Sequence, residues 1–185
     1  MSTRHIALLC LLLATVSVST GCSTIAKETV GLVRGASGSM VARDPVSEDP
    51  AARPLGEYTQ FELGPFTDDF GKTPASLFTH LETKFAEQLA DSRLANRSGG
   101  KTLVARGTVI HYESEDLIGM AISPVEEVVA RVELVDGASG QVLGTANCVG
   151  RGTTRTTLGV EQKAAGLSKA ILSWIEKRYP KPEEN

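Results

Sequence analysis

Apolar and polar side chains alternate along four stretches of the chain, which predicts four strands. In the first stretch, Tyr58 to Phe66, Phe61 and Leu63 share one face and polar residues flank them, the period of a half-buried strand. The other three stretches are Leu103–Tyr112, Glu127–Val135 and Gln141–Gly150. The turn between the last two contains two glycines, Gly137 and Gly140, so these two strands are expected to form a β-hairpin.

Two further stretches repeat their apolar residues every three or four positions, which predicts two amphipathic helices. The first begins at Thr73-Pro74, an expected N-cap followed by a first-turn proline. Its apolar stripe is Leu77, Phe78, Leu81, Phe85 and Leu89. The second helix covers about Gly159 to Tyr179, and Pro180 ends it. Five of its charged residues are expected on the solvent side: Glu161, Lys163, Lys169, Glu176 and Lys177.

The order strand, helix, strand, strand, strand, helix predicts an α+β fold. We expect a small mixed or antiparallel sheet of about four strands with two helices packed on one face. This single domain should span residues 58–180, with a disordered tail at 181–185. Residues 22–57 are expected to form a flexible tether, because glycines and prolines interrupt every apolar period there and little surface can be buried to offset the ordering entropy.

Residues 1–21 have the layout of a secretory signal peptide. Arg4 and His5 precede a continuous run of apolar or small residues, Ile6 to Val18, and small residues follow it. The run has 13 residues, whereas a helix needs roughly 20 to cross a bilayer. A cleaved signal is therefore favoured over a retained transmembrane span.

Cysteine usage directs attention to Cys22. Cys10 lies inside the signal and Cys148 is alone in the body of the chain. Secreted domains that depend on disulfides use even sets of cysteines, so the apolar core is expected to hold this fold together. A Cys22–Cys148 bridge is the weaker alternative to modification of Cys22.

The residues around this cysteine, Ser19-Thr20-Gly21-Cys22, resemble the lipobox of bacterial lipoproteins. In that family a small residue precedes a cysteine that is acylated, by palmitate among other chains, and becomes the mature amino terminus. The resemblance implies a lasting membrane anchor, because two or more acyl chains hold a protein firmly. Ser23, where inner-membrane lipoproteins often have aspartate, implies the outer membrane facing the periplasm. Ser19 replaces the family's usual leucine, which leaves ordinary signal cleavage open.

A second resemblance covers about residues 58–179. A strand leads into a proline-started helix, then come Ala105–Tyr112 and Val132–Gly144, and a helix closes the chain. This plan is similar to the periplasmic domain of CsgG-type lipoproteins, to the TolB amino-terminal domain and to a group of uncharacterised lipoproteins. Their hairpin has an aspartate, a Thr-Gly turn and Val-Leu, matched here by Asp136, Ser139-Gly140 and Val142-Leu143. The resemblance implies the fold and an envelope location, not pore formation.

Charge excludes one class of partner. The full chain has 19 basic and 22 acidic residues, a net charge of −3. Loss of residues 1–21 removes one basic residue, Arg4, so the mature chain would have 18 against 22, or −4. With no basic cluster, nucleic acid is not an expected partner.

The best candidate for chemistry is the sequence His111-Tyr-Glu-Ser-Glu-Asp116. On an extended strand His111, Glu113 and Glu115 would share one face and could present nitrogen and oxygen ligands to a divalent metal, with Asp116 beside them. Neighbouring carboxylates repel one another, however, so a solvated strand end is the favoured interpretation. No catalytic residue, metal or cofactor is expected. A metal-dependent enzyme that uses His111 and these carboxylates is the alternative.

The connection after this strand is more apolar than a loop requires. It contains Leu117, Ile118, Met120 and Ile122. These residues could pack over the end of the sheet, or could form an exposed patch for a partner protein, for self-association or for a lipid or other small hydrophobic ligand. The sequence therefore predicts a lipid-anchored, non-enzymatic binding or assembly protein of the bacterial cell envelope.

Overall fold

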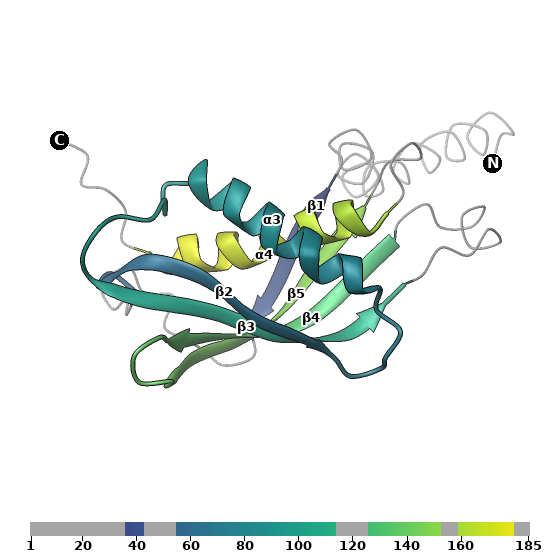
Figure 1. Ribbon diagram of the computed structural model, residues 1–185, viewed down its shortest axis with the longest axis horizontal. Coiled ribbons are helices and arrows are strands. Elements are labelled where there is room, and N and C mark those ends of the chain that lie inside the picture. Colours follow the sequence, from purple (N-terminus) through teal and green to yellow (C-terminus); the bar gives the residue numbers. More distant parts are fainter. Residues whose placement is uncertain (1–35, 43–54, 114–125, 153–158, 180–185) are drawn as a thin grey trace, which may run out of the picture. The chain divides into compact units, whose positions relative to one another are not determined.

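The computed structural model describes residues 36–42, 55–113, 126–152 and 159–179 (Figure 1). The elements in chain order are β1 (Ser37–Ala42), β2 (Tyr58–Asp68), α3 (Ala75–Ala90), β3 (Lys101–Tyr112), β4 (Glu126–Asp136), β5 (Val142–Gly152) and α4 (Val160–Arg178). The predicted signal peptide, most of the predicted tether and the predicted tail lie outside the described residues. The six predicted elements are present. Their ends lie within two residues of the expected ones except at the end of the first helix, which was expected to continue to about Asn96 and stops at Ala90.

The five strands form one mixed sheet in the order β1-β5-β4-β3-β2. β2 and β3 run parallel, and the other three pairs are antiparallel. Both helices lie on the same face of the sheet and pack against each other (Figure 1). The predicted α+β class is therefore confirmed, with five strands where about four were expected.

The additional strand, β1, lies within the range predicted as tether. It pairs with β5, and Gly38 is the register partner of Gly150. Gly166 of α4 lies directly over these two glycines: a Cβ there would be 2.8 Å from Arg151 N and 3.0 Å from Gly150 Cα. The helix backbone can approach the two strands this closely only because all three residues lack a side chain. Gly38, which the sequence placed in a flexible tether, thus takes part in a contact between helix and sheet.

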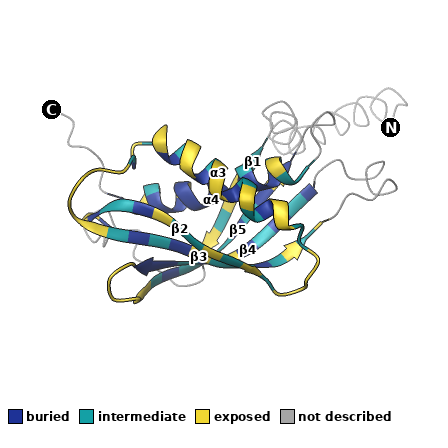
Figure 2. Ribbon diagram, viewed as in Figure 1, coloured by how far each residue is buried: buried dark blue, intermediate teal, exposed yellow. Residues whose placement is uncertain are grey.

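The core lies between the two helices and the sheet face below them (Figure 2). The largest buried apolar side chain, Trp174 of α4, is 1% exposed. α3 contributes a stripe with four-residue spacing, Leu77, Leu81, Phe85 and Leu89. The prediction for Lys163 was wrong: it is 1% exposed rather than on the solvent side.

The start of α3 also differs from the expectation. Pro74, not Thr73, occupies the N-cap, and no side chain caps the helix there. The backbone N–H of Thr73 instead donates to the Asp68 carboxylate at 2.7 Å. The loop before the helix is thus fixed by Asp68 rather than by a capping threonine.

Candidate functional site

Most residues with a predicted role fall outside the described part of the chain. These are Cys22, the apolar residues Leu117, Ile118, Met120 and Ile122, and the carboxylates Glu115 and Asp116. Their predicted roles stay predictions. Within the described residues, no helix is long and apolar enough to cross a membrane.

His111 and Glu113 of the candidate metal cluster are described, and both are exposed at the end of β3. A register irregularity lies between Val109 and His111, just before the candidate cluster. The backbone N–H of Glu113 donates to Glu127 O at 3.0 Å, which extends the pairing of β3 and β4. The described residues contain no group of three or more His, Cys, Asp or Glu side chains that could hold a metal ion.

The two neighbouring aspartates at the end of β2, Asp68 in the strand and Asp69 after it, have different surroundings. Asp68 accepts backbone hydrogen bonds from Phe70 at 2.9 Å and Thr73 at 2.7 Å. The bond from Thr73, and then that from Phe70, lower the pKa of Asp68. Asp69 is exposed. Asp68 therefore organises the loop into α3, and Phe70, whose side chain is 59% exposed, stands out from it.

A row of mainly polar residues crosses the sheet face opposite the helices. The strand registers place Thr67, Thr108, Arg131, Asn147 and Val41 in line, one from each strand from β2 to β1. Thr67, Arg131 and Val41 are exposed, and the other two are partly buried. This row, which we call the polar row, was missed by the sequence reasoning because it needs the strand order. The sequence signals it only through the polar residues at alternate positions of each strand.

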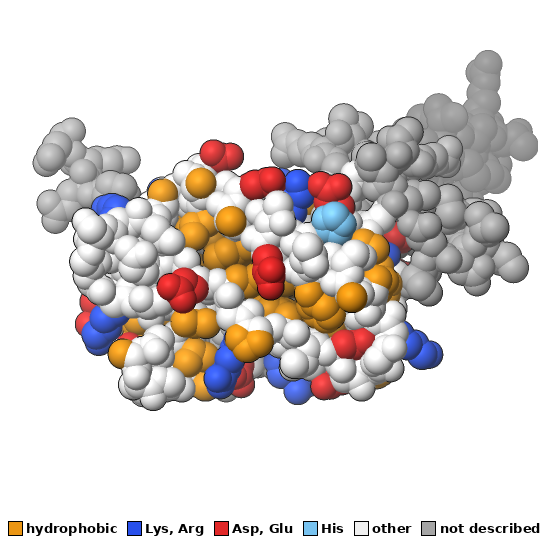
Figure 3. Space-filling view, viewed as in Figure 1, with side chains coloured by type: hydrophobic (Ala, Val, Ile, Leu, Met, Phe, Trp, Pro, Cys, Tyr) orange, Lys and Arg blue, Asp and Glu red, His pale blue; other side chains and the backbone are white. Residues whose placement is uncertain are grey.

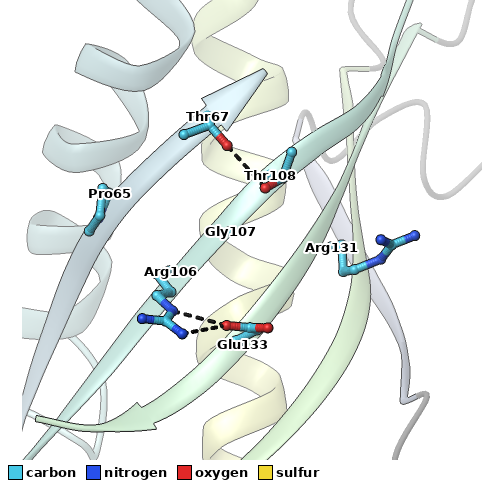
Figure 4. Close-up of a pocket in the computed structure, with 7 residues that line it drawn as sticks. All are labelled: Pro65, Thr67, Arg106, Gly107, Thr108, Arg131 and Glu133. Atoms are coloured by element: carbon cyan, nitrogen blue, oxygen red, sulfur yellow. Dashed lines mark hydrogen bonds and ion pairs between the residues drawn. The ribbon is translucent and has the colours of Figure 1, made fainter. Parts of the chain in front are cut away.

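A shallow pocket of about 250 Å³ lies along this row (Figure 4). It is lined by Pro65, Thr67, Arg106, Gly107, Thr108, Arg131 and Glu133. Thr67 Oγ1 and Thr108 Oγ1 are 3.0 Å apart. Arg106 uses both Nε and an Nη to contact Glu133 Oε2, each at 2.9 Å.

Arg131 points away from the Arg106–Glu133 pair (Figure 4). Because that pair neutralises itself, Arg131 supplies the pocket's uncompensated positive charge among its described lining residues. Threonine hydroxyls and a guanidinium can bind polar or anionic groups of a partner.

A buried ion pair lies where β3, β4 and α4 meet. Lys163 Nζ is 2.7 Å from Glu126 Oε2, and the exposed fractions of these two side chains are 1% and 9%. The same ammonium donates to Glu113 O at 2.6 Å and lies 4.3 Å from the centre of the Tyr112 ring. Lys163 therefore binds the end of β3 and the start of β4 to one point on the helix.

The aspartate of the predicted hairpin motif has a structural role. Asp136 Oδ1 accepts bonds from Ser139 N at 2.7 Å, Ser139 Oγ at 2.9 Å and Ala138 N at 3.1 Å. Asp136 Oδ2 accepts from the Tyr58 hydroxyl at 2.8 Å. The backbone bond from Ser139 and then the bond from Tyr58 lower the pKa of Asp136 to about 2, whereas burial raises the pKa of Tyr58. The aspartate thus fastens the hairpin turn to the first residue of β2.

Cys148 is a free thiol buried in the core. Burial raises the pKa of the Cys148 thiol to about 12, as expected of a small core residue. Hydrophobic side chains are visible at the surface of this face of the molecule (Figure 3). Leu63 and Phe66 of β2 and Phe78 of α3 are partly buried and pack against the core.

No protein-family model and no curated protein matches this chain. Among solved structures, a variant PelC dodecamer from Paraburkholderia phytofirmans is similar with a TM-score of 0.46 and 14% identity over 74% of this chain and 94% of that one. A second PelC dodecamer crystal gives 0.44, 12%, 74% and 94%.

A protein from Caulobacter crescentus described as a candidate lipoprotein gives a TM-score of 0.37 and 13% identity over 62% of this chain and 86% of that one. At these identities and TM-scores the likeness does not extend to function. The expected resemblance to the CsgG and TolB domains stays a prediction.

Proposed function

We propose that the protein is a lipoprotein of the bacterial cell envelope that binds or assembles with other envelope proteins and catalyses no reaction. Acylated Cys22 would anchor it to the outer membrane, with the α+β domain in the periplasm. The anchor is supported by the signal-like segment and by Ser19-Thr20-Gly21-Cys22.

The single structural observation that carries the binding role is the sheet face opposite the helices. α3 and α4 both cover the other face, while the polar row crosses all five strands on this one. An exposed face of hydroxyl, amide and guanidinium groups on a rigid sheet offers a partner a fixed set of hydrogen-bonding groups. Arg131 lies at the middle strand of the row and is the residue whose loss should matter most.

The anchor is tested by mass analysis of the mature amino terminus. Acylated Cys22 is the expected terminus, and Cys22→Ser should release the protein from membranes into the soluble fraction. Ser23→Ala is the matched control and should stay membrane-bound. An unmodified cysteine, or a terminus elsewhere, would overturn the lipoprotein assignment.

The binding face is tested by crosslinking in the native envelope. Arg131→Glu reverses the uncompensated charge of the pocket and should abolish capture of the partner protein. Lys177→Glu makes the same charge change on the exposed side of α4 and should leave capture unchanged. Equal capture by both variants would place the binding surface elsewhere.

The non-enzymatic assignment is tested by titrating the full chain with zinc or manganese while its melting temperature is followed. No shift is expected, and His111→Ala should behave as the natural protein does. A metal-dependent stabilisation that is lost in His111→Ala would favour the metal-enzyme alternative.

A further inference from the structure

The two edges of the sheet differ in how well they are protected. At the β2 edge, the Asn96 side chain accepts from Phe61 N at 2.7 Å and donates to Phe61 O at 3.4 Å, and Arg97 N donates to Thr59 O at 3.0 Å. Farther along, Pro65 removes a backbone donor where the register shifts between Leu63 and Phe66. The β2 edge therefore cannot accept another strand along its length.

The β1 edge has none of these features within the described residues. Its six residues, Ser-Gly-Ser-Met-Val-Ala, include no proline and no charge. Among the described residues, β5 is the only strand that pairs with it. Val41 is 66% exposed, the highest value among the large apolar side chains described. An uncharged, regular edge strand is a template for pairing with another strand.

β1 is also held in a fixed position. Its Gly38 packs directly against the backbone of α4, and Lys169 Nζ of that helix lies 3.5 Å from Ala36 O. An edge that is already ordered loses little conformational entropy when a second strand pairs with it. This favours specific association over a transient contact.

We infer that β1 pairs with β1 of a second copy of this chain, in antiparallel orientation about a two-fold axis. Residues opposite each other in such a pair must point to the same face. One register that satisfies this places Met40 opposite Met40, Val41 opposite Ser39 and Gly38 opposite Ala42. The residues that lie opposite each other are uncharged and mostly small, so no like charges meet. Each exposed Val41 side chain also gains a neighbour across the pair.

The pairing joins two five-stranded sheets into one, with all helices on one side and both polar rows on the other. It does not depend on acylation of Cys22, but it is compatible with that anchor. Residues 23–36 would separate each Cys22 from β1, and 14 residues can span up to about 50 Å. Two antiparallel strands of six residues place their starts only about 20 Å apart, so both anchors can reach one bilayer.

Disulfide trapping tests the register directly. Met40→Cys is made in a full chain that also carries Cys148→Ala, because Cys148 is the register partner of Met40 in β5. Oxidised in the native envelope, this chain should give a disulfide-linked dimer, because opposite residues in an antiparallel pair lie within disulfide range. Ser39→Cys tests the alternative register centred on Ser39. Thr67→Cys on the β2 edge is the control and should give none. Absence of a dimer from both β1 variants, or a disulfide to a different protein, would overturn the inference.

A charge variant separates self-association from misfolding. Val41→Lys changes a side chain that is already exposed, so the fold and melting temperature should be unchanged, while sedimentation of the full chain in detergent should shift from dimer to monomer. Val142→Lys makes the same change at a residue that is 42% exposed and lies outside the β1–β5 pairing, and should remain dimeric. A monomeric natural protein, or dimeric Val41→Lys, counts against the proposed contact.

Discussion

Lys163 is a buried charged residue that joins three elements of the fold. Its ammonium holds the Glu126 carboxylate, the Glu113 carbonyl and the Tyr112 ring at one place in the interior. Lys163→Met should lower the free energy of unfolding by about 3–5 kcal/mol, because it leaves the Glu126 carboxylate buried without its partner. Urea denaturation measures this loss, and Lys177→Met, at an exposed position of the same helix, should change the free energy of unfolding by less than about 0.5 kcal/mol.

A double variant distinguishes lost pairing from lost packing. Lys163→Met combined with Glu126→Leu removes both charges and should recover much of the stability, since apolar residues often replace a buried pair at little cost. A double variant no more stable than Lys163→Met alone would show that the damage comes from packing rather than from the orphaned carboxylate.

Asp136 makes the stability depend on pH at the acid end. Its pKa is about 2 in the folded protein, below the value of about 3.9 for an unfolded chain. The folded state therefore binds fewer protons, so this contribution is present above about pH 4 and disappears as the pH falls towards 2. Unfolding measured from pH 5 to 2 should show a steeper loss for the natural protein than for Asp136→Asn. Parallel pH curves for the two proteins would contradict this role.

At the scale of elements, periodicity predicted every helix and strand with a strong apolar pattern. β1 was not predicted, because Ser37, Gly38 and Ser39 show almost no alternation of apolar and polar residues. Its position in the sheet also depends on packing against α4, which lies far along the chain. Lys163 was misplaced because a lone lysine in a helical pattern indicates solvent, while its partner Glu126 lies in another element. Such features depend on contacts between distant segments, which a local period cannot report.

The contact between the three glycines of α4, β1 and β5 predicts that replacing a helical glycine by alanine lowers the stability, the opposite of the usual effect. Alanine is favoured over glycine inside a helix by about 1 kcal/mol, so propensity alone would make Gly166→Ala stabilising. The added Cβ would instead press against Arg151 N and Gly150 Cα and force α4 off the sheet, a loss of about 1–3 kcal/mol. Gly159→Ala, with nothing within 4 Å of the new Cβ, is the control and should change thermal unfolding only slightly.

At the scale of the whole molecule, the boundary of the folded unit is the point at which sequence and structure differ most. The alternation of residues 58–66 made Tyr58 the expected start, whereas the compact unit of the structure begins at Gly35 and includes β1. A chain that starts at residue 58 would lack β1, and the Met40 side chain that packs at the core next to Cys148 would be missing. The two boundaries therefore predict different stabilities for truncated chains.

Two truncations and one thiol test this boundary. Both remove Cys10 and Cys22, so Cys148 is the single cysteine that remains in each. Deletion of residues 1–34 keeps β1, and the thiol, buried and with a pKa raised to about 12, should stay unreactive towards a disulfide reagent at pH 8. Deletion of residues 1–57 removes the strand next to β5, so Cys148 should react at least about tenfold faster and the melting temperature should fall, because local opening that exposes the thiol costs less free energy. Equal thiol reactivity in the two truncated chains would mean that β1 adds nothing to the folded unit. The folded unit would then start at Tyr58, as the sequence predicts.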